Sequence, residues 1–360
     1  MLTARFLPPA LFSPMAGVVA DRFSRKHVMV LCDLLRAVVV LGFLLVKTRE
    51  DVWLVYALCF AQMGLAAFFD PAEQASIGST VEPHEVVTAN TLQGATWSAM
   101  LGIGAVAGGL LTATVGREAS FVVDAMSYLL SAFFISRAVL PRTLQPPPAR
   151  TLAGRLGFTD LLEGLALVRA RPDIRRVLWV KTAWGLTGGA ALMLYAVMGR
   201  HVFGVPGSPD MGVGVLLGMR GVGALIGPLI ARRIGGDAPE YLERAIGWAF
   251  LVTAFFWALF SFAPNLFVAA VLLSLAHMGV ATQWVFSSSL INLRVEDRFR
   301  GRVFAVDSMF FLVVLGISSW AGGKALDAFH IQPRVLMFTL SVILCGSAAV
   351  WWWLRRPVQH

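Results

Sequence analysis

Charged side chains are scarce in this chain. Of its 360 residues 14% are Asp, Glu, Lys or Arg and 57% are hydrophobic, and four stretches (52–69, 182–199, 245–293 and 335–354) carry no charge at all. A helix that crosses a bilayer needs about 20 apolar residues and satisfies its own backbone hydrogen bonds. The composition therefore predicts an all-α, polytopic helical bundle in a membrane.

Cysteine is also rare, and motifs for catalysis are missing. Cys32, Cys59 and Cys345 all lie in apolar runs, which indicates free buried thiols and excludes a disulfide framework. There is no extramembrane Ser-His-Asp arrangement, no phosphate-binding loop, no zinc motif and no cleavable signal peptide. We expect a protein that is not an enzyme and that uses no cofactor and no metal.

Positive charge exceeds negative charge, with a net charge of +9 and a pI near 10.2. The basic residues gather in connections on one side of the predicted spans, 20 against 7 on the other side. This distribution argues against a nucleic-acid partner and indicates a membrane topology. It predicts a multi-pass protein of the plasma membrane, in contact with the lipid bilayer, whose C-terminus is cytoplasmic.

Eleven spans are predicted. They cover residues 5–20, 28–46, 52–69, 91–115, 119–139, 177–199, 211–231, 245–262, 265–287, 303–322 and 335–354, with a tight hairpin at Pro264-Asn265. The connections predicted on the cytoplasmic side include 70–90, 140–176 and 288–302. The chain thus divides into an N-terminal bundle (1–139), a linker (140–176) and a C-terminal bundle (177–360). Apolar residues at helical spacing in the linker favour an amphipathic helix on the membrane surface over a plain linker.

The two bundles are related by an internal repeat. The segments at 101–103 and 107–109, Leu-Gly-Ile and Ala-Gly-Gly, recur unchanged 214 residues later, at 315–317 and 321–323. A repeat on either side of a central linker is typical of transporters built from two bundles.

A dense charged segment lies between two apolar runs, from Gly17 to Lys26. Gly17 allows close helix approach. Asp21 follows the end of a helix, where an anion is unfavourable, so we expect it to face another helix's N-terminus. Arg22, Arg25 and Lys26 would face lipid headgroups or acidic partners.

This segment resembles the loop signature of the major facilitator superfamily, Gly-x-x-x-Asp-Arg-x-Gly-Arg-Lys, with Ser24 in place of the second Gly. Ser13 to Arg22, Asp33 to Ala37 and Phe68 to Ala72 further resemble its macrolide-efflux and enterobactin-exporter branch. The resemblance implies two pseudo-symmetric bundles with alternating access. It also implies that Asp21 latches the two halves near the span at 303, with Arg302 and Asp307 as further members; a simple topogenic loop is the alternative.

Two departures from the family stand out. Gly104-Ala105 lacks the Pro of the drug/proton antiporter motif, which weakens the case for proton antiport. The C-terminal bundle has a span, 177–199, whose counterpart by the 214-residue offset would precede Met1. Comparison of the two bundles therefore predicts that this sequence lacks the family's first helix. Either the true start codon lies upstream, or the chain is naturally truncated.

Ionisable groups inside the spans are candidates for the substrate path or for coupling. Asp33 and Arg36 share a helical face, as a structural pair or as a coupling site. Lys181 is expected to extend to the membrane surface. The remaining candidates are Arg220, Asp124, Asp307, Gln93, Trp97 and His277, of which His277 is more typical of a hydrogen-bonded core residue.

The resemblance, taken with these residues, implies an exporter of a small amphipathic molecule, such as a drug, a macrolide or a siderophore, with protons as the second partner. Asp33, Asp124 or Asp307 would carry the proton. Two alternatives stay open: an importer of the same fold, and a membrane protein without transport activity that serves as a scaffold or sensor. No pattern indicates an oligomeric state.

Overall fold

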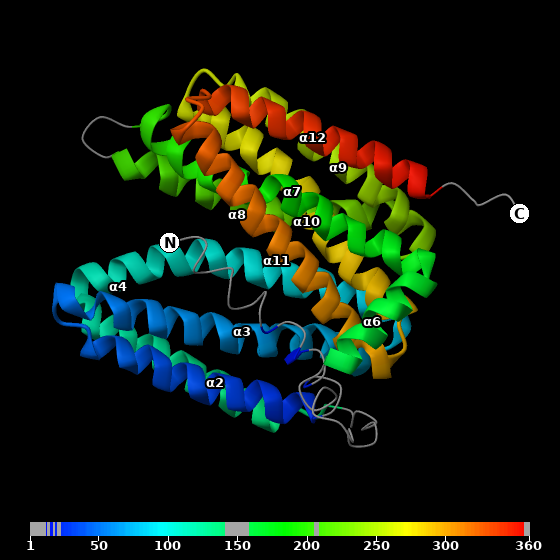
Figure 1. Cartoon of the computed structure of the whole chain (residues 1–360), viewed down its shortest axis with the longest axis horizontal. Helices are drawn as coiled ribbons and strands as arrows, with labels where there is room; N and C mark the ends of the chain where they lie inside the picture. Colours follow the sequence, from blue (N-terminus) through cyan, green and yellow to red (C-terminus); the bar gives the residue numbers. More distant parts are fainter. Residues whose placement is uncertain are drawn as a thin grey trace, which may run out of the picture. The chain divides into compact units, whose positions relative to one another are not determined.

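The fold is a bundle of long helices (Figure 1). The computed structural model describes residues 12, 15–16, 19, 23–140, 158–204 and 209–355, and within these ranges the chain contains no β-strand. Nine helices in the described ranges are long and apolar enough to cross a membrane. The predicted all-α membrane bundle is confirmed, whereas the predicted span at 5–20 lies almost wholly outside the described residues.

Within the described residues the long helices have the following bounds: α2 (Arg25–Gly42), α3 (Val52–Thr80), α4 (Val86–Arg137), α6 (Phe158–Ala170), α7 (Pro172–His201), α8 (Pro209–Gly235), α9 (Pro239–Ser261), α10 (Leu266–Arg294), α11 (Asp297–Asp327) and α12 (Pro333–Leu354). Short 3₁₀ turns lie at Phe43–Leu45, Arg49–Asp51 and Pro83–Glu85. The hairpin predicted at Pro264-Asn265 is present between α9 and α10, where the Asn265 side chain accepts a hydrogen bond from the Val268 amide at 3.0 Å.

Helix α4 consists of two helices that meet at Gly116. Its backbone has φ 86° and ψ 169°, a conformation that essentially only glycine adopts. The break falls between the predicted spans 91–115 and 119–139, which therefore correspond to the two parts of α4.

Two predicted connections are wrong because the helices run further than the apolar stretches. α3 continues through Pro71 to Thr80, so most of the predicted 70–90 loop is helical. Ala72, Ala75 and Ser76 are buried beyond the proline, and this packing outweighs the lost backbone hydrogen bond. Likewise, only residues 295–296 separate α10 from α11, not the predicted 288–302.

The structure describes only part of the predicted linker. Helix α6 occupies part of the predicted 140–176 segment, and α7 begins directly after it, whereas residues 141–157 lie outside the description. Val168 of α6 is buried in protein while Leu162 is exposed; the role of this helix as a linker on the membrane surface stays a prediction.

The described chain forms two compact units. Unit 1 comprises Met1–Pro83, Ala105–Pro172 and Ile291–Val313; unit 2 comprises His84–Gly104, Asp173–Leu290 and Val314–His360. Helices α4 and α11 therefore each contribute to both units. The predicted boundaries at 139 and 177 stay a prediction.

In unit 1, α2 packs along α3 and along the later part of α4. The core of α2 is formed by Val28, Met29 and Cys32, which meet Ala72 of α3. Further along, Ala37 and Val40 contact Ala125 of α4. Figure 1 shows α2 and α3 as long neighbouring ribbons at the blue end of the chain.

Unit 2 has a core of large side chains. Trp257 and Trp351 are fully buried, and the Trp351 indole donates to the Glu243 carbonyl at 3.1 Å. Tyr195 meets Phe260 edge to face with ring centroids 6.1 Å apart. These contacts join α7, α9 and α12, and α9 and α12 run side by side in Figure 1.

Candidate gating and coupling site

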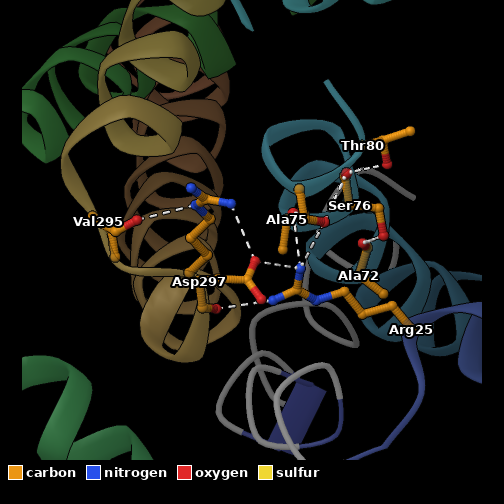
Figure 2. Close-up of polar contacts among 9 residues, drawn as sticks. Arg25, Ala72, Ala75, Ser76, Thr80, Val295 and Asp297 are labelled. Atoms are coloured by element: carbon orange, nitrogen blue, oxygen red, sulfur yellow. Dashed lines mark hydrogen bonds and ion pairs between the residues drawn. The ribbon is translucent and has the colours of Figure 1, made fainter. Parts of the chain in front are cut away.

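Arg25 joins three helix ends within unit 1 (Figure 2). It is the first residue of α2, and its side chain is only 5% exposed. On α3, Nη1 donates to the carbonyl of Ala75 at 3.0 Å and to the hydroxyl of Ser79 at 3.3 Å. At the start of α11, Nη1 donates to Asp297 Oδ1 at 2.9 Å and Nη2 to the Asp297 carbonyl at 3.0 Å.

Asp297 is shared between two arginines. It is the first residue of α11, where a carboxylate interacts favourably with the helix dipole. Arg300 Nη1 also donates to Asp297 Oδ1 at 3.1 Å, while Arg300 Nε is held by the Val295 carbonyl at 3.0 Å. We call the group of Arg25, Asp297 and Arg300 the Arg25–Asp297 clamp. It connects residues 272 positions apart in the sequence.

The end of α3 is shaped to fit against the clamp. At Gly78, a methyl group would lie 2.7 Å from the Asn292 side-chain oxygen and 3.0 Å from Arg300 Nη1. A larger residue would therefore displace the Asn292 or Arg300 side chain, or push α3 away from the segment that carries Asp297. In the same turn, the Thr80 hydroxyl donates to the Ser76 carbonyl at 2.6 Å and so gives a carbonyl near the helix end a side-chain hydrogen bond.

The clamp involves Arg25, a residue of the charged segment from Gly17 to Lys26, and not the predicted latch residue Asp21. Gly17, Asp21 and Arg22 lie outside the described residues. Arg25 has an acidic partner, in line with its predicted surroundings. Lys26 instead donates to the Ala138 carbonyl at 2.9 Å, just beyond the end of α4, where a cation suits the helix dipole.

Arg302 and Asp307 lie further along α11 than the clamp residue Asp297. Arg302 Nη1 donates to Glu163 Oε2 of α6 at 2.7 Å, and its guanidinium lies 5.4 Å from the Phe299 ring. Asp307 is 1% exposed, one turn and a half further along α11. The sequence interpretation missed Asp297, although a signal exists: the tripeptide Asp-Arg-Phe occurs at 21–23 and again at 297–299.

Asp33 and Arg36 form a buried pair, as predicted from their spacing. Arg36 Nη1 lies 3.6 Å from Asp33 Oδ1, and the Ser131 hydroxyl of α4 donates to Asp33 Oδ2 at 2.6 Å. The Arg36 guanidinium lies over the Phe69 ring of α3, 4.8 Å from its centroid, and 5.7 Å from that of Tyr128. Three helices of unit 1 thus surround one ion pair.

The remaining candidates are dispersed. Asp124 and Trp97 are exposed, whereas Gln93 and Arg220 are half-buried. His277 is a buried core residue of unit 2, as the sequence favoured: its Nδ1 is 3.1 Å from the Leu273 carbonyl, which makes Nδ1 the donor, and its ring meets that of Tyr195 edge to face. The roles assigned to these residues stay predictions.

Lys181 differs from its prediction. Instead of extending to a surface, it is 5% exposed, and its ammonium lies 4.7 Å from the ring centroid of Trp284 on α10. A cation over an indole face is stabilised by the ring's quadrupole, which accommodates a charge that could not reach water. The predicted start of α7 at 177 was too late, because the helix begins at Pro172.

Comparison with known proteins identifies the family. The sequence profile described as Major Facilitator Superfamily matches residues 1–243 of the chain. The chain belongs to the major facilitator superfamily. It is therefore an integral, multi-pass membrane protein of a transporter family, and membrane transport is its general function.

Relatives from this superfamily match almost the whole chain. The protein named "Putative bacilysin exporter BacE" from Bacillus subtilis (strain 168) is 24% identical over 338 residues, which cover 94% of this chain and 81% of the relative. The multidrug resistance protein MdtG from Escherichia coli O9:H4 (strain HS) is 25% identical over 363 residues, covering 98% and 83%.

Solved structures of the superfamily share the fold. The human organic anion transporter MFSD10 (TETRAN) superposes with a TM-score of 0.78 at 18% identity, covering 97% of this chain and 82% of that one. The Escherichia coli fucose:proton symporter FucP gives a TM-score of 0.71 at 14% identity, covering 97% and 90%. The architecture is thus that of the superfamily's helical bundle.

Proposed function

We propose that this protein is a secondary active transporter that exports a small amphipathic molecule, such as a drug, a macrolide or a siderophore, across the plasma membrane. Its C-terminus lies on the cytoplasmic side. The names of two relatives, a bacilysin exporter and a multidrug resistance protein, support export. Transport is coupled to protons, carried by Asp33, Asp124 or Asp307.

The Arg25–Asp297 clamp is the observation that carries this proposal. Alternating access needs contacts that hold in one state and break in the other. Arg25 bonds at once to the end of α3 and the start of α11, so the three helix ends hold together while it is engaged. Asp297 is 41% exposed, which gives water a way to replace the arginine when the contact opens.

The strength of the clamp suits a reversible contact. A hydrogen bond to a charged group contributes about 1.5–3 kcal/mol to stability. Exposure of one partner to water moves this contribution toward the lower end of that range. An equilibrium between two states changes tenfold for every 1.4 kcal/mol. One guanidinium therefore shifts the balance between states by about one order of magnitude without locking either state.

Transport in membrane vesicles tests the function. Everted and right-side-out vesicles with the full-length protein would be energised by a proton gradient and given erythromycin, ethidium or enterobactin as probes. We expect uptake of at least one probe into everted vesicles only, and its loss when a protonophore collapses the gradient. Uptake into right-side-out vesicles would instead make the protein an importer. Absence of movement of every probe in a correctly inserted protein would overturn the proposal.

A further inference from the structure

A polar cluster around a buried ion pair lies inside unit 1, away from the Arg25–Asp297 clamp. Its members come from three helices: Asp33 and Arg36 from α2, Gln62 and Phe69 from α3, and Tyr128 and Ser131 from the later part of α4. The six residues are joined by an ion pair, two hydrogen bonds and two cation–π contacts.

The Asp33 carboxylate is nearly excluded from solvent but is not tightly paired. It is 1% exposed, and its separation of 3.6 Å from Arg36 Nη1 exceeds a normal hydrogen-bond length. Its direct hydrogen bond comes from the neutral hydroxyl of Ser131, at 2.6 Å. A hydroxyl can also accept a hydrogen bond, so Ser131 suits both the carboxylate and the neutral acid.

Arg36 keeps partners whichever form Asp33 takes. Its guanidinium lies over the rings of Phe69 and Tyr128, whose faces attract a cation. The Tyr128 ring is fixed by a hydrogen bond of 2.8 Å from Gln62 to its hydroxyl. Removing one partner of a buried ion pair is normally costly because the other charge is left uncompensated. The two rings lower that cost for Arg36.

We propose that Asp33 is the proton-binding carboxyl of this transporter, and that Arg36, held between Phe69 and Tyr128, is the permanent counter-charge that lets Asp33 exchange its proton. This inference rests on the proposed function and selects one of its three candidate carriers. In the step, one proton bonds to a carboxylate oxygen of Asp33 and the carboxylate becomes a neutral acid. Arg36 stays protonated, and no electron is transferred.

Other titratable groups facing the cluster do not replace Asp33. On α4, Tyr128 contributes its ring face to Arg36, and Asp124, which acts on Tyr128 electrostatically, is exposed. On α2, Cys32 is a buried thiol of the apolar core. On α3, Asp70 also acts on Arg36 electrostatically. Asp33 differs from it in being paired with Arg36 and hydrogen-bonded by Ser131 within the cluster, so Asp70→Asn should retain the behaviour that Asp33→Asn loses.

Infrared spectroscopy tests the site without any transported substrate. The full-length protein in liposomes of phosphatidylethanolamine and phosphatidylglycerol would be compared at acid and alkaline pH. Beside the bands of the other carboxyls, we expect the wild type to show a carbonyl component of a buried protonated acid that Asp33→Asn lacks and that Asp124→Asn retains. An unchanged band in Asp33→Asn, or its loss in Asp124→Asn or Asp307→Asn instead, would overturn the proposal.

A second variant guards against a folding defect in Asp33→Asn. Ser131→Ala keeps the carboxyl but removes its hydrogen-bond donor, so the band should change frequency; an identical frequency would contradict the site.

Failure of the proposed proton site is distinguishable from failure of the proposed function. If the infrared band behaves as expected while no probe is transported, the site stands and the function fails. If probe transport remains proton-coupled in Asp33→Asn, the function stands and the site fails.

Discussion

At the scale of single residues, the guanidinium of Arg25 donates hydrogen bonds to several polar groups that water would otherwise solvate. The carbonyls of Ala75 and Asp297 both depend on it, and it neutralises the Asp297 carboxylate. Because Arg25 is almost fully buried, its loss removes one donor from each of these groups and leaves Arg300 as the arginine that pairs with the Asp297 carboxylate. Arg298, one residue after Asp297, instead pairs with Glu296 in an exposed position and has no such role.

Gly78 provides a prediction at the same scale. An added methyl group at Gly78 would press on Asn292 and on Arg300, which holds Asp297. We expect Gly78→Ala to lower the melting temperature of the purified protein, by the equivalent of about 1–3 kcal/mol for an overpacked contact. Gly316→Ala on α11 is the matched control, because a methyl there meets no described atom within 4 Å. Equal or higher melting temperatures for Gly78→Ala would contradict the close fit of α3.

Single residues were predictable where a local pattern determines their contact. The three-residue spacing of Asp33 and Arg36 within one apolar helix predicted their pairing, because residues so spaced share a helix face. Asp297 was not found, because the helix that it begins was predicted to start at 303. No local sequence pattern links Arg25 to a partner 272 positions away. The repeated tripeptide Asp-Arg-Phe was the one sequence feature that pointed to Asp297.

At the scale of helices, the apolar stretches gave the order of the membrane helices in the described part of the chain but not their ends. α3 and α11 both extend beyond their apolar runs, through the segments that carry Ser79 and Asp297. Hydropathy reports the part of a helix that suits lipid, whereas its end depends on packing and capping outside that part. The clamp lies in these extensions, so sequence periodicity could not locate it.

Helix α6 allows a prediction at this scale. Its Glu163 bonds to the buried Arg302 of α11 at 2.7 Å but is itself 59% exposed. We expect Glu163→Gln to speed amide hydrogen exchange in α6 up to about fivefold, because a pair exposed on one side contributes at most about 1 kcal/mol. Glu296→Gln, which removes an exposed pair with Arg298, should leave α6 unchanged. Unaltered exchange in Glu163→Gln would show that the pair does not hold α6.

At the scale of the whole molecule, the family and the helical architecture followed from charge scarcity and the loop signature. The asymmetry of Lys and Arg, 20 against 7, also predicts orientation. The division into bundles at 139 and 177 remains a prediction, because α4 and α11 each contribute to both compact units. A long helix that passes between units cannot be assigned to one of them from its sequence.

Orientation can be measured with reporter fusions. We expect a green fluorescent protein fused after His360 to fluoresce in bacterial cells, because a cytoplasmic C-terminus lets it fold. Alkaline phosphatase fused at the same position should be inactive. Active phosphatase together with a dark fluorescent protein would place the C-terminus outside and reverse the topology.

A double-mutant cycle on probe transport tests most directly whether the Arg25–Asp297 clamp governs the transport cycle. Export rates of ethidium or erythromycin would be compared for wild type, Arg25→Ala, Asp297→Ala and the double variant, with Arg298→Ala as the control. We expect each single variant to change the rate about tenfold, the double variant to match the singles, and the control to behave as wild type. Strictly additive effects, or a wild-type rate in Arg25→Ala, would contradict the clamp.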